Sequence, residues 1–241
     1  MPGLPLVSCL MVTRAANLNF IDNAIYCYIS QTYENKELVI VPDCDPISLE
    51  CLEAFLEKYK DEKIKLAIPD KKMPLGALRN VSIRNASGDY CIQWDDDDLY
   101  HAERIEKQFF HLIDGKGYDY CLLKNYMMYF RNTKLLSMNR WPDHYSIVGK
   151  PASIMFRKNI KYRYPDGTHL GEDTVIAENT KLKCCLVDNM PFLYIYNYHG
   201  HNCYDYYHYL SLYNETKIPF DMDVLDKVTP MLDKAGFEYR Y

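Results

Sequence analysis

Short apolar runs alternate with helix-like segments along the first hundred residues of the chain. The apolar runs predict β-strands, whereas apolar residues spaced three or four positions apart predict helices with one buried face. Strands are expected at residues 6–13, 37–41, 63–68 and 90–94, and helices at residues 20–31, 47–59 and 74–86. This alternation predicts an α/β fold with a mostly parallel central sheet flanked by helices on both faces.

The second half of the chain is less regular. We expect a helix around residues 105–112, strands within residues 118–131 and 184–198, and helices at residues 204–214 and 222–235. In between, Gly149, Pro151 and Gly167 interrupt the pattern, and only a short helical stretch opening at Glu172 is predicted. No repeat or low-complexity linker divides the sequence, so we expect one domain over residues 1–241.

Composition narrows the classes of protein further. The 241 residues are 48% hydrophobic, enough for one substantial core, and the net charge is −5 with scattered Lys and Arg residues. Such a balance argues against nucleic acid or an anionic membrane as the main partner. No apolar run suits a transmembrane helix, no signal peptide is evident, and the nine Cys residues contain no CxxC pair. We therefore expect a reducing, cytoplasmic compartment.

Four consecutive acids, Asp95 to Asp98, follow the apolar strand at residues 90–94. Ligands of parallel sheets bind beyond the carboxyl ends of the strands, so these acids should share one rim with the residues that follow the first two strands. Adjacent carboxylates repel one another, and Mg²⁺ or Mn²⁺ prefers such oxygen ligands. The position therefore favours a divalent cation site over a solvated acidic loop. The spacing of an EF-hand is absent.

Several short motifs occur in an order and spacing that resemble glycosyltransferase family 2. The motifs are GALRN at residues 76–80, ASGDY at 86–90, WDDDD at 94–98, GED at 171–173 and YNYHGHN at 196–202. The strand at residues 7–13 and the segment from Gln31 to Val41 resemble that family's first strand and its step into the second. The likeness extends from about residue 6 to about residue 202.

The resemblance implies a GT-A (nucleotide-diphospho-sugar transferase) fold and hexosyltransferase activity. About residues 1–100 would form a nucleotide-binding half, and about residues 101–241 an acceptor-binding half that includes the C-terminal helices. The implied donor is a UDP-sugar, first of all UDP-glucose or UDP-galactose, with Mn²⁺ or Mg²⁺ as cofactor. The implied acceptor is a hydroxyl of a glycan, a glycolipid or a glycosylated protein.

Carried over residue by residue, the resemblance implies roles for nine positions. Asp97 would ligate the metal, His199 would support the metal or the diphosphate, and Asp173 would be the general base. The positions that would contact the nucleotide are Thr13, Arg14 and Asp43 around the uridine, Arg79 facing the nucleotide, and Asp95 or Asp96 at the ribose.

The chemistry of sugar transfer agrees with these roles. The transition state resembles an oxocarbenium ion while negative charge develops on the leaving diphosphate, and a metal ion stabilises that charge. The acceptor hydroxyl must lose a proton as it attacks, which requires a carboxylate such as Asp173 within reach. In-line attack would invert the anomeric centre, although a retaining enzyme of the same fold stays open. The next candidates for the base are Asp143 and Asp166.

The chain departs from the family pattern at four places. They are Arg14-Ala15 in place of Tyr-Asn, Pro42 in place of an acid, Leu78 in place of Ala, and Asn197 in place of Arg. The first three replace residues that the family pattern places near the nucleobase, so the nucleobase contacts of this chain would differ from that pattern. The last implies that another cation, such as Lys72 or Arg157, holds the diphosphate.

Two other classes of protein stay open. A nucleotidyltransferase would need a Gly-rich phosphate loop after the first strand, and residues 13–17 contain no Gly. A catalytically silent module that binds glycans or nucleotide sugars would have no need of both Asp97 and Asp173. The sequence names neither the transferred sugar, nor the acceptor, nor the oligomeric state.

Two local features also have alternative interpretations. His199, His201 and Cys203 would share one face of a strand and resemble a zinc cluster, but no further ligand pair accompanies them, so a polar rim of the site is favoured. Trp141 lies where an acceptor lid could form and would either stack on a sugar or belong to the core.

Overall fold

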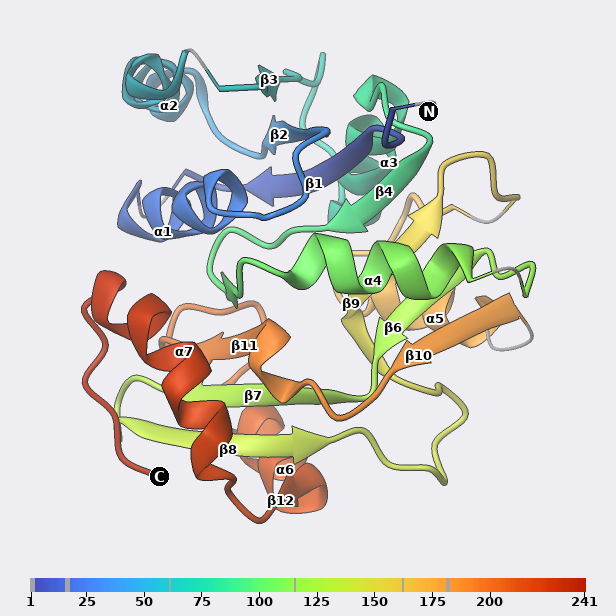
Figure 1. The fold of residues 1–241 in the computed structure, drawn as a ribbon. Helices are drawn as coiled ribbons and strands as arrows, with labels where there is room; N and C mark the ends of the chain where they lie inside the picture. Colours follow the sequence, from blue (N-terminus) through green and yellow to red (C-terminus); the bar gives the residue numbers. More distant parts are fainter. Residues whose placement is uncertain (1–2, 16–17, 61, 115, 162, 181–182) are drawn as a thin grey trace.

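The computed structural model describes residues 3–15, 18–60, 62–114, 116–161, 163–180 and 183–241. Figure 1 shows two groups of strands, one above the other, with helices packed around both. The described part of the chain thus builds a central sheet mainly from its first half and a second sheet mainly from its second half.

The central sheet has seven strands in the described residues. They are β1 (Val7–Thr13), β2 (Lys36–Pro42), β3 (Ile64–Leu66), β4 (Tyr90–Gln93), β6 (Tyr120–Leu123), β9 (Lys150–Arg157) and β10 (Cys184–Val187). Their order is β10-β6-β9-β4-β1-β2-β3, and only β9 runs antiparallel to its neighbours. Strands β1, β2 and β4 are buried almost throughout, as expected for parallel strands covered on both faces. The mostly parallel sheet predicted from the sequence is confirmed.

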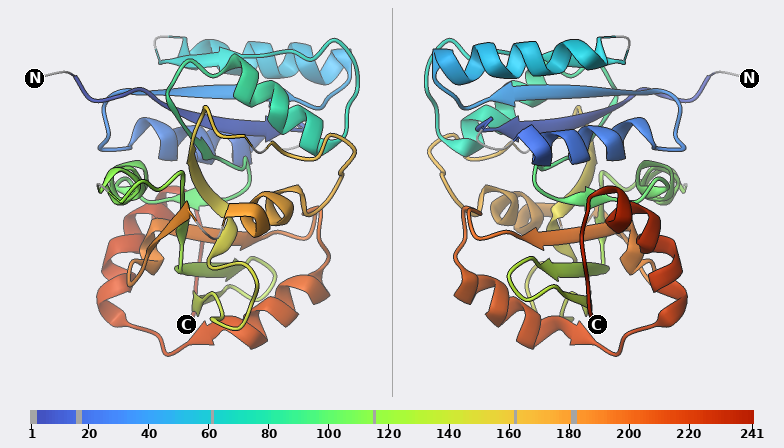
Figure 2. Two further views of the ribbon diagram at one scale, coloured as in Figure 1. Left: turned by 90° about the vertical axis from the view of Figure 1, so that its right-hand side faces the viewer. Right: turned by 90° about the vertical axis from the view of Figure 1, so that its left-hand side faces the viewer.

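Helices cover both faces of this sheet, as predicted. The helices concerned are α1 (Leu18–Ile29), α2 (Pro46–Leu56), α3 (Leu75–Asn85), α4 (Arg104–Ile113) and α5 (Glu172–Thr180). The left panel of Figure 2 views the molecule from the side and shows α4 on one side of the sheet, with α3 and α5 on the other. Helix α3 packs on β1 and β2, and α5 packs on β9.

The second sheet was not predicted as a separate layer. Its strands are β5 (Leu99–Tyr100), β7 (Asn125–Phe130), β8 (Leu135–Arg140), β11 (Tyr194–Tyr198) and β12 (Lys217–Ile218), in the order β12-β8-β7-β11-β5. Helices α6 (Tyr206–Thr216) and α7 (Met222–Lys234) lie on opposite sides of it in Figure 1. Two of these strands have only two residues each, which is too short for a hydrophobic period to be visible in the sequence.

Strand β9 lies in the stretch where the sequence predicts no strand, partly because Pro151 is its second residue. Proline lacks the N–H that a central strand donates to its neighbours. Here β4 pairs only with Met155 to Arg157, and the register between β9 and β6 shifts between Cys121 and Leu123. Pro151 therefore falls in the irregular part of the ladder, where its missing N–H is tolerated.

The segment that leads into α5 is held against α3 by the first and the last residue of the GALRN motif. A Cβ atom on Gly76 would lie 2.0 Å from the carbonyl oxygen of Pro165, so only glycine allows this approach. Asn80 donates hydrogen bonds from Nδ2 to the carbonyl of Tyr164 and to Oδ1 of Asp166, both at 2.7 Å. These contacts fix the position of the first turn of α5 relative to the end of the central sheet.

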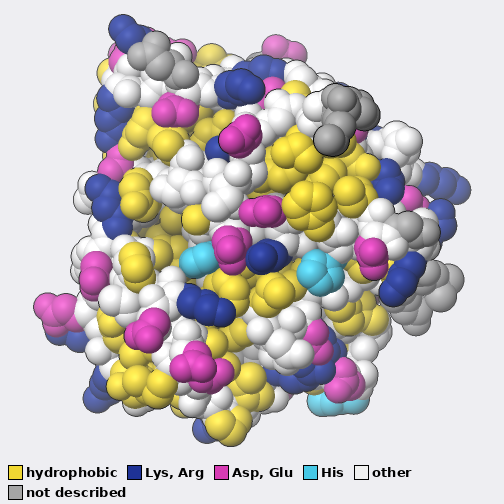
Figure 3. Space-filling view, viewed as in Figure 1, with side chains coloured by type: hydrophobic (Ala, Val, Ile, Leu, Met, Phe, Trp, Pro, Cys, Tyr) yellow, Lys and Arg dark blue, Asp and Glu magenta, His cyan; other side chains and the backbone are white. Residues whose placement is uncertain are grey.

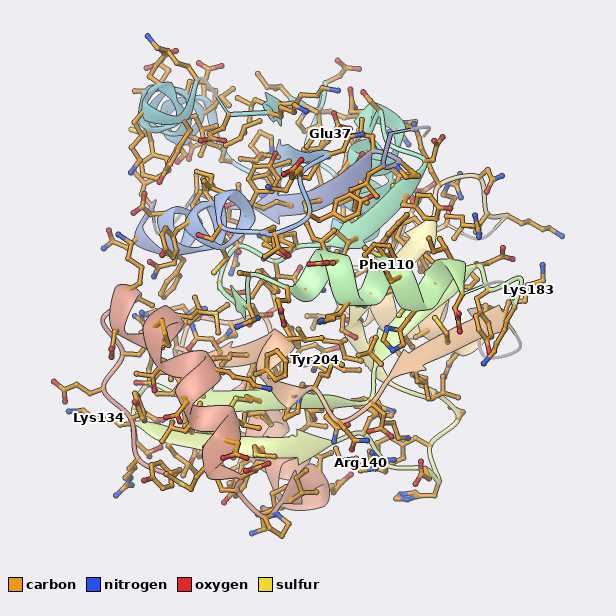
Figure 4. All side chains as sticks on the ribbon, in the orientation of Figure 1. Glu37, Phe110, Lys134, Arg140, Lys183 and Tyr204 are labelled. Carbon is orange, nitrogen blue, oxygen red and sulfur yellow. The ribbon has the colours of Figure 1, made fainter. Side chains whose placement is uncertain are left out.

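The surface carries charges of both signs. Lys and Arg side chains are interspersed with Asp and Glu side chains over the face shown in Figure 3. In Figure 4, Lys134 and Lys183 project from opposite edges of the molecule, whereas Tyr204 is seen near its middle. Within the described ranges, no helix has both the length and the apolar character needed to cross a membrane.

Candidate active site

A cavity of about 850 Å³ opens at the carboxyl ends of β1, β2 and β4. The first turn of α5 and the loop between β11 and α6 complete its wall. All nine residues to which the family resemblance assigns roles line this cavity, namely Thr13, Arg14, Asp43, Arg79, Asp95, Asp96, Asp97, Asp173 and His199. Residues that are up to 186 positions apart in the sequence, Thr13 and His199, are thus brought to one place.

The ends of β1 and β2 form one end of the cavity. The backbone N–H of Asp43 donates to the carbonyl of Thr13 at 2.7 Å, which ties the two strand ends together. The Thr13 hydroxyl donates to Asp96 Oδ2 at 2.5 Å and accepts from the backbone N–H of Ala15 at 3.0 Å. Arg14 Nη2 donates to the carbonyl of His201 at 3.3 Å and so links β1 to the loop after β11.

The four acids after β4 point in different directions, and each has its own partners. Their partners are Arg79 Nη2 and Gln93 Nε2 for Asp95, Thr13 for Asp96, His199 and Asn202 for Asp97, and Tyr194 with the backbone of Asn197 for Asp98. Mutual repulsion is therefore reduced by separation of the carboxylates, by their hydrogen bonds and, for Asp95, by the charge of Arg79. Burial, followed by the charge of Asp97, raises the pKa of Asp96 to about 7. Burial and the same neighbour raise the pKa of Asp98 well above its ordinary value.

Asp97 and His199 form the pair best suited to hold a divalent cation. Asp97 Oδ2 lies 3.0 Å from His199 Nε2 and accepts a hydrogen bond from Asn202 Nδ2 at 3.1 Å. Asp97 Oδ1 has no hydrogen-bond partner within the described ranges and is free to bind a ligand. The His199 ring is held against Phe20, with centroids 4.3 Å apart.

These two side chains fit a metal that is completed by substrate, since Mg²⁺ typically takes one or two carboxylates plus phosphate oxygens. The described residues contain no group of three His, Cys, Asp or Glu side chains arranged to hold a metal ion by themselves. His199, His201 and Cys203 all line the cavity, but they do not form the cluster that their spacing suggests.

The first turn of α5 separates two neighbouring carboxylates. Glu172 is buried and accepts a hydrogen bond from Arg79 Nε at 2.6 Å, whereas Asp173 is half-buried and accepts from the backbone N–H of Thr174 at 2.7 Å. Burial and the neighbouring Glu172 raise the pKa of Asp173 to about 6, although Arg79 and Lys150 act in the opposite direction. A carboxylate with such a pKa can accept a proton near neutral pH.

Arg79 lies in the wall of the cavity with two of its nitrogens already occupied. Its Nε bonds Glu172 and its Nη2 bonds Asp95 at 2.9 Å, so it joins α3, α5 and the acid run. The sequence predicted that Arg79 faces the nucleotide, but it did not predict this bridge. A pair 93 residues apart leaves no local pattern in a single sequence.

Arg104 is a further residue whose importance was not predicted. Its side chain is fully buried, and its guanidinium carbon lies 4.4 Å from the centroid of the Tyr100 ring. Arg104 Nη2 donates to the carbonyl of Gln93 at 3.1 Å, and the Tyr100 hydroxyl accepts from the backbone N–H of Asp95 at 2.7 Å. Arg104 and Tyr100 thereby fix the backbone at the start of the acid run, at Gln93 and Asp95. The one signal in the sequence for this role is that Arg104 lies on the apolar face of the predicted helix.

Several secondary candidates from the sequence lie away from the cavity. Lys72 lines it, but Arg157 does not: Arg157 bonds the Tyr90 hydroxyl at 2.8 Å at the start of β4, so it is not the missing diphosphate cation. Neither alternative base lines the cavity; Asp143 pairs with Lys124, and Asp166 accepts from Asn80.

Trp141 belongs to the core and does not line the cavity. It is 7% exposed, and its indole N–H donates to the carbonyl of Ile147 at 2.8 Å. Its expected alternative role in sugar stacking is therefore not supported.

The fold and the cavity define a glycosyltransferase of the GT-A type. Residues 8–171 match the family model described as glycosyl transferase family 2, and the chain belongs to that family. The matched segment contains Thr13, Arg79 and the acid run but ends just before Glu172. The candidate roles of Asp173 and His199 therefore depend on their places in the cavity.

Curated relatives of this chain include two bacterial proteins. One, from Escherichia coli, is named UDP-Glc:alpha-D-GlcNAc-diphosphoundecaprenol beta-1,3-glucosyltransferase WfgD; it is 26% identical over 216 residues, which are 88% of this chain and 72% of that protein. An uncharacterized glycosyltransferase of Haemophilus influenzae is 27% identical over 180 residues, 69% of each chain.

Solved structures with a similar fold include S. aureus TarS and a mannosyltransferase. The complex of TarS 1-349 with UDP has a TM-score of 0.61 at 16% identity, and the similarity covers 81% of this chain and 61% of that one. PcManGT from Pyrobaculum calidifontis, in complex with GDP-Man and Mn²⁺, has a TM-score of 0.58 at 11% identity, and the similarity covers 99% of this chain and 66% of that one. At these identities the comparison supports the GT-A fold.

Proposed function

We propose that this protein transfers a hexose from a UDP-sugar to a hydroxyl of a carbohydrate acceptor, with a divalent metal and with inversion at the anomeric carbon. The observation that carries the proposal is the single cavity in which the ends of β1 and β2, the acid run and Asp173 meet. A nucleotide-sugar donor has three parts that must be held, and this cavity offers a distinct set of groups for each.

The donor nucleotide would lie over the ends of β1 and β2. Thr13, Arg14 and Asp43 would border the uridine, with Asp95 or Asp96 at the ribose. UDP is favoured as the nucleotide because WfgD is named for UDP-Glc and the similar TarS structures hold UDP or UDP-GlcNAc. A relative from Borreliella burgdorferi is named a cholesterol galactosyltransferase, so glucose and galactose are both reasonable sugars.

Asp97 and His199 would hold Mn²⁺ or Mg²⁺ together with oxygens of the donor diphosphate. When bound there, the cation would neutralise the charge that develops on the leaving group. Asn202 restrains Asp97, and Phe20 restrains His199, so both ligands are positioned before the donor arrives. Lys72, which also lines the cavity, is the available cation in place of the missing family arginine.

Asp173 would take the proton from the attacking hydroxyl. Its neighbour Glu172 is engaged with Arg79, so Asp173 is the carboxylate of this turn that remains available to a substrate. Attack from the Asp173 side, opposite the diphosphate, would invert the configuration of the transferred sugar. The name of WfgD includes a lipid-linked sugar, and that of the Bacillus subtilis relative TuaG includes teichuronic acid biosynthesis, so both favour an acceptor hydroxyl on a glycan or a lipid-linked sugar. A glycosylated protein would present the same group.

A panel experiment tests the proposal. The protein is incubated with UDP-glucose, UDP-galactose, UDP-GlcNAc or GDP-mannose, with Mn²⁺ or with excess EDTA, and the release of nucleotide is measured with and without methyl glycosides as acceptors. We expect UDP release that requires the metal and increases with an acceptor.

Other outcomes would assign the protein to another class. Release of pyrophosphate from UTP and a sugar 1-phosphate would identify a nucleotidyltransferase. Tight binding of UDP-sugars without any turnover, over the whole panel, would indicate a silent binding module and would overturn the proposal.

A further inference from the structure

Tyr204 lies at the mouth of the cavity, in the loop between β11 and α6, and the proposed mechanism does not use it. Its ring is half-buried and stacks on the ring of His208, with centroids 4.0 Å apart and an angle of 17° between the planes. His208 belongs to the first turn of α6, which is capped by Asp205: the Asp205 side chain accepts from the backbone N–H of His208 at 2.9 Å. The Tyr204 ring is therefore held in a defined orientation.

The hydroxyl of Tyr204 reaches across the cavity mouth to the start of α5. A Cβ atom on Gly171 would lie 3.4 Å from the Tyr204 oxygen, so this oxygen is next to the backbone that precedes Glu172 and Asp173. In agreement, burial and then the charges of Asp173 and Glu172 raise the pKa of Tyr204. Within the described ranges the hydroxyl has no hydrogen-bond partner, so it is available to a ligand.

The other tyrosines of the cavity wall have a different environment. Tyr209 is 2% exposed and stacks on Tyr196 at 4.5 Å, and both rings pack into the layer between α6 and the second sheet. Tyr204 thus differs from them in offering both an accessible ring and a free hydroxyl beside the candidate base. A tyrosine held in this way loses little conformational entropy when it binds a ligand.

We propose that Tyr204, supported by His208, recognises the sugar ring that carries the attacking hydroxyl, and so helps to select a pyranose acceptor. This inference rests on the proposed function, since it places the acceptor on the Asp173 side of the donor. The apolar C–H face of a pyranose would pack on the aromatic ring, and a neighbouring sugar hydroxyl would accept from, or donate to, the Tyr204 oxygen.

The test compares three variants with the wild-type protein at saturating UDP-sugar and Mn²⁺. The acceptor probes are the methyl β-glycosides of glucose, galactose and N-acetylglucosamine, and the affinity for UDP is measured separately by calorimetry. Tyr204→Ala removes the ring and the hydroxyl, whereas Tyr204→Phe removes the hydroxyl alone. Tyr207→Ala is the matched control, because Tyr207 is 75% exposed on the same helix end and does not line the cavity.

We expect Tyr204→Ala to raise the acceptor KM at least about tenfold while the Kd for UDP changes less than about twofold. Tyr204→Phe should raise the acceptor KM by a smaller factor, about three- to tenfold, as expected for the loss of one hydrogen bond. Tyr207→Ala should leave both constants within about twofold of wild type. An unchanged acceptor KM in Tyr204→Ala, or an equal loss of acceptor and UDP affinity, would overturn the inference.

Failure of the proposed function would be recognised separately. If the wild-type protein transfers no sugar, binding of the same glycosides in the presence of UDP is followed by saturation-transfer NMR. Binding that is lost in Tyr204→Ala but kept in Tyr207→Ala would support the acceptor site on a protein without transferase activity. Equal binding by both variants, or no binding by the wild type, would overturn it.

Discussion

Arg79 and Glu172 form a buried ion pair, with 2.6 Å between Nε and Oε1, that joins helix α3 to the first turn of α5. Both side chains are at least nine-tenths buried, at 9% and 4% exposure. The pair takes up one of two adjacent carboxylates and leaves the other, Asp173, facing the cavity. The geometry of the candidate base thus depends on a contact between segments that are 93 residues apart.

The first prediction concerns the stability that this pair provides. Arg79→Met should lower the free energy of unfolding by about 3–5 kcal/mol, because Glu172 would be left buried without a partner. Arg84→Met is the matched control, since Arg84 lies on the same helix but is exposed, and its substitution should change stability by less than about 0.5 kcal/mol. Urea unfolding of both variants measures the difference. Equal stabilities would contradict a structural role for the pair.

Much of the central sheet could be predicted because its strands have local signals. Strands β1, β2 and β4 are mostly apolar runs, and the carboxyl-end rule places Thr13, Asp43 and the acid run at one edge from the order of the elements alone. The second sheet could not be predicted in the same way: β7 and β8 are neighbours in the sequence, but β11, β5 and β12 join them from distant segments, and two of these strands are two residues long. Strand β9 was not predicted either, because Pro151, its second residue, is unusual in a central strand.

The same distinction holds for the cavity. Motif order was enough to nominate nine residues, and the structure brings all nine to one cavity. The partners of these residues were not predictable: Arg79 with Glu172, Thr13 with Asp96, and Asp97 with Asn202 are contacts between segments far apart in the chain. Tyr204 could not be distinguished by sequence from the other tyrosines, because its stacking on His208 and its approach to Gly171 are tertiary features.

The second prediction concerns the metal. Asp97→Ala should abolish transfer and weaken UDP binding in the presence of Mn²⁺, while the far-ultraviolet circular dichroism spectrum stays unchanged. Asp97 is a quarter exposed and one of its two carboxylate oxygens is unengaged within the described ranges, so its removal should cost little stability. Asp226→Ala, on the exposed side of α7, is the control and should keep full activity. Full activity of the wild type in excess EDTA would show that the metal is not required.

The third prediction concerns the nucleotide. UDP with Mn²⁺ should stabilise the protein against thermal unfolding by RT ln(1 + [L]/Kd), which is about 2.7 kcal/mol at one hundred times the Kd. GDP at the same concentration should stabilise it much less, because guanine presents other hydrogen-bonding groups than the uracil that Thr13, Arg14 and Asp43 are proposed to border. Differential scanning fluorimetry over a range of nucleotide concentrations gives both values. Equal stabilisation by the two nucleotides would contradict a uridine-specific site.

The fourth prediction links Asp173 to the dependence of stability on pH. Burial and Glu172 raise its folded pKa to about 6, with Asp95 acting in the same direction and Arg79 and Lys150 against it. The folded state therefore holds this proton more tightly than the unfolded chain, so the stabilisation is present below the ordinary pKa and is lost as the pH rises through about 6. Asp173→Asn should accordingly be more stable than the wild type at about pH 7.5, and less so as the pH falls.

Thermal unfolding of the two proteins between about pH 4.5 and pH 8 measures this difference. Asp226→Asn provides the comparison, because it makes the same change of side chain at an exposed position of α7 that does not line the cavity. A constant difference between Asp173→Asn and the wild type would mean that the environment of Asp173 does not shift its pKa.

The fifth prediction concerns catalysis by the same residue. Asp173→Asn should lower the rate of transfer by about 10²–10⁴-fold, which is the usual cost of removing a general base. Its affinity for UDP should hardly change, because the groups proposed to hold the nucleotide and the metal lie on β1, β2, the acid run and His199. This separation of chemistry from binding distinguishes Asp173 from Asp97, whose removal should damage both. Wild-type transfer should also decline as the pH falls through about 6, because the base becomes protonated.

The stereochemistry of the product provides an independent check on Asp173. A base on the acceptor side of the donor requires in-line attack, so an α-linked donor sugar should give a β-linked product, which the anomeric proton signal in NMR reports. Retention of the α configuration, or near-wild-type transfer by Asp173→Asn, would contradict the assignment. Neither Asp143 nor Asp166 could then replace it without a rearrangement, because Asp143 pairs with Lys124 and Asp166 with Asn80, and neither lines the cavity. The base would have to be sought among the cavity's remaining carboxylates, where Asp96, with its pKa raised to about 7, is the first candidate.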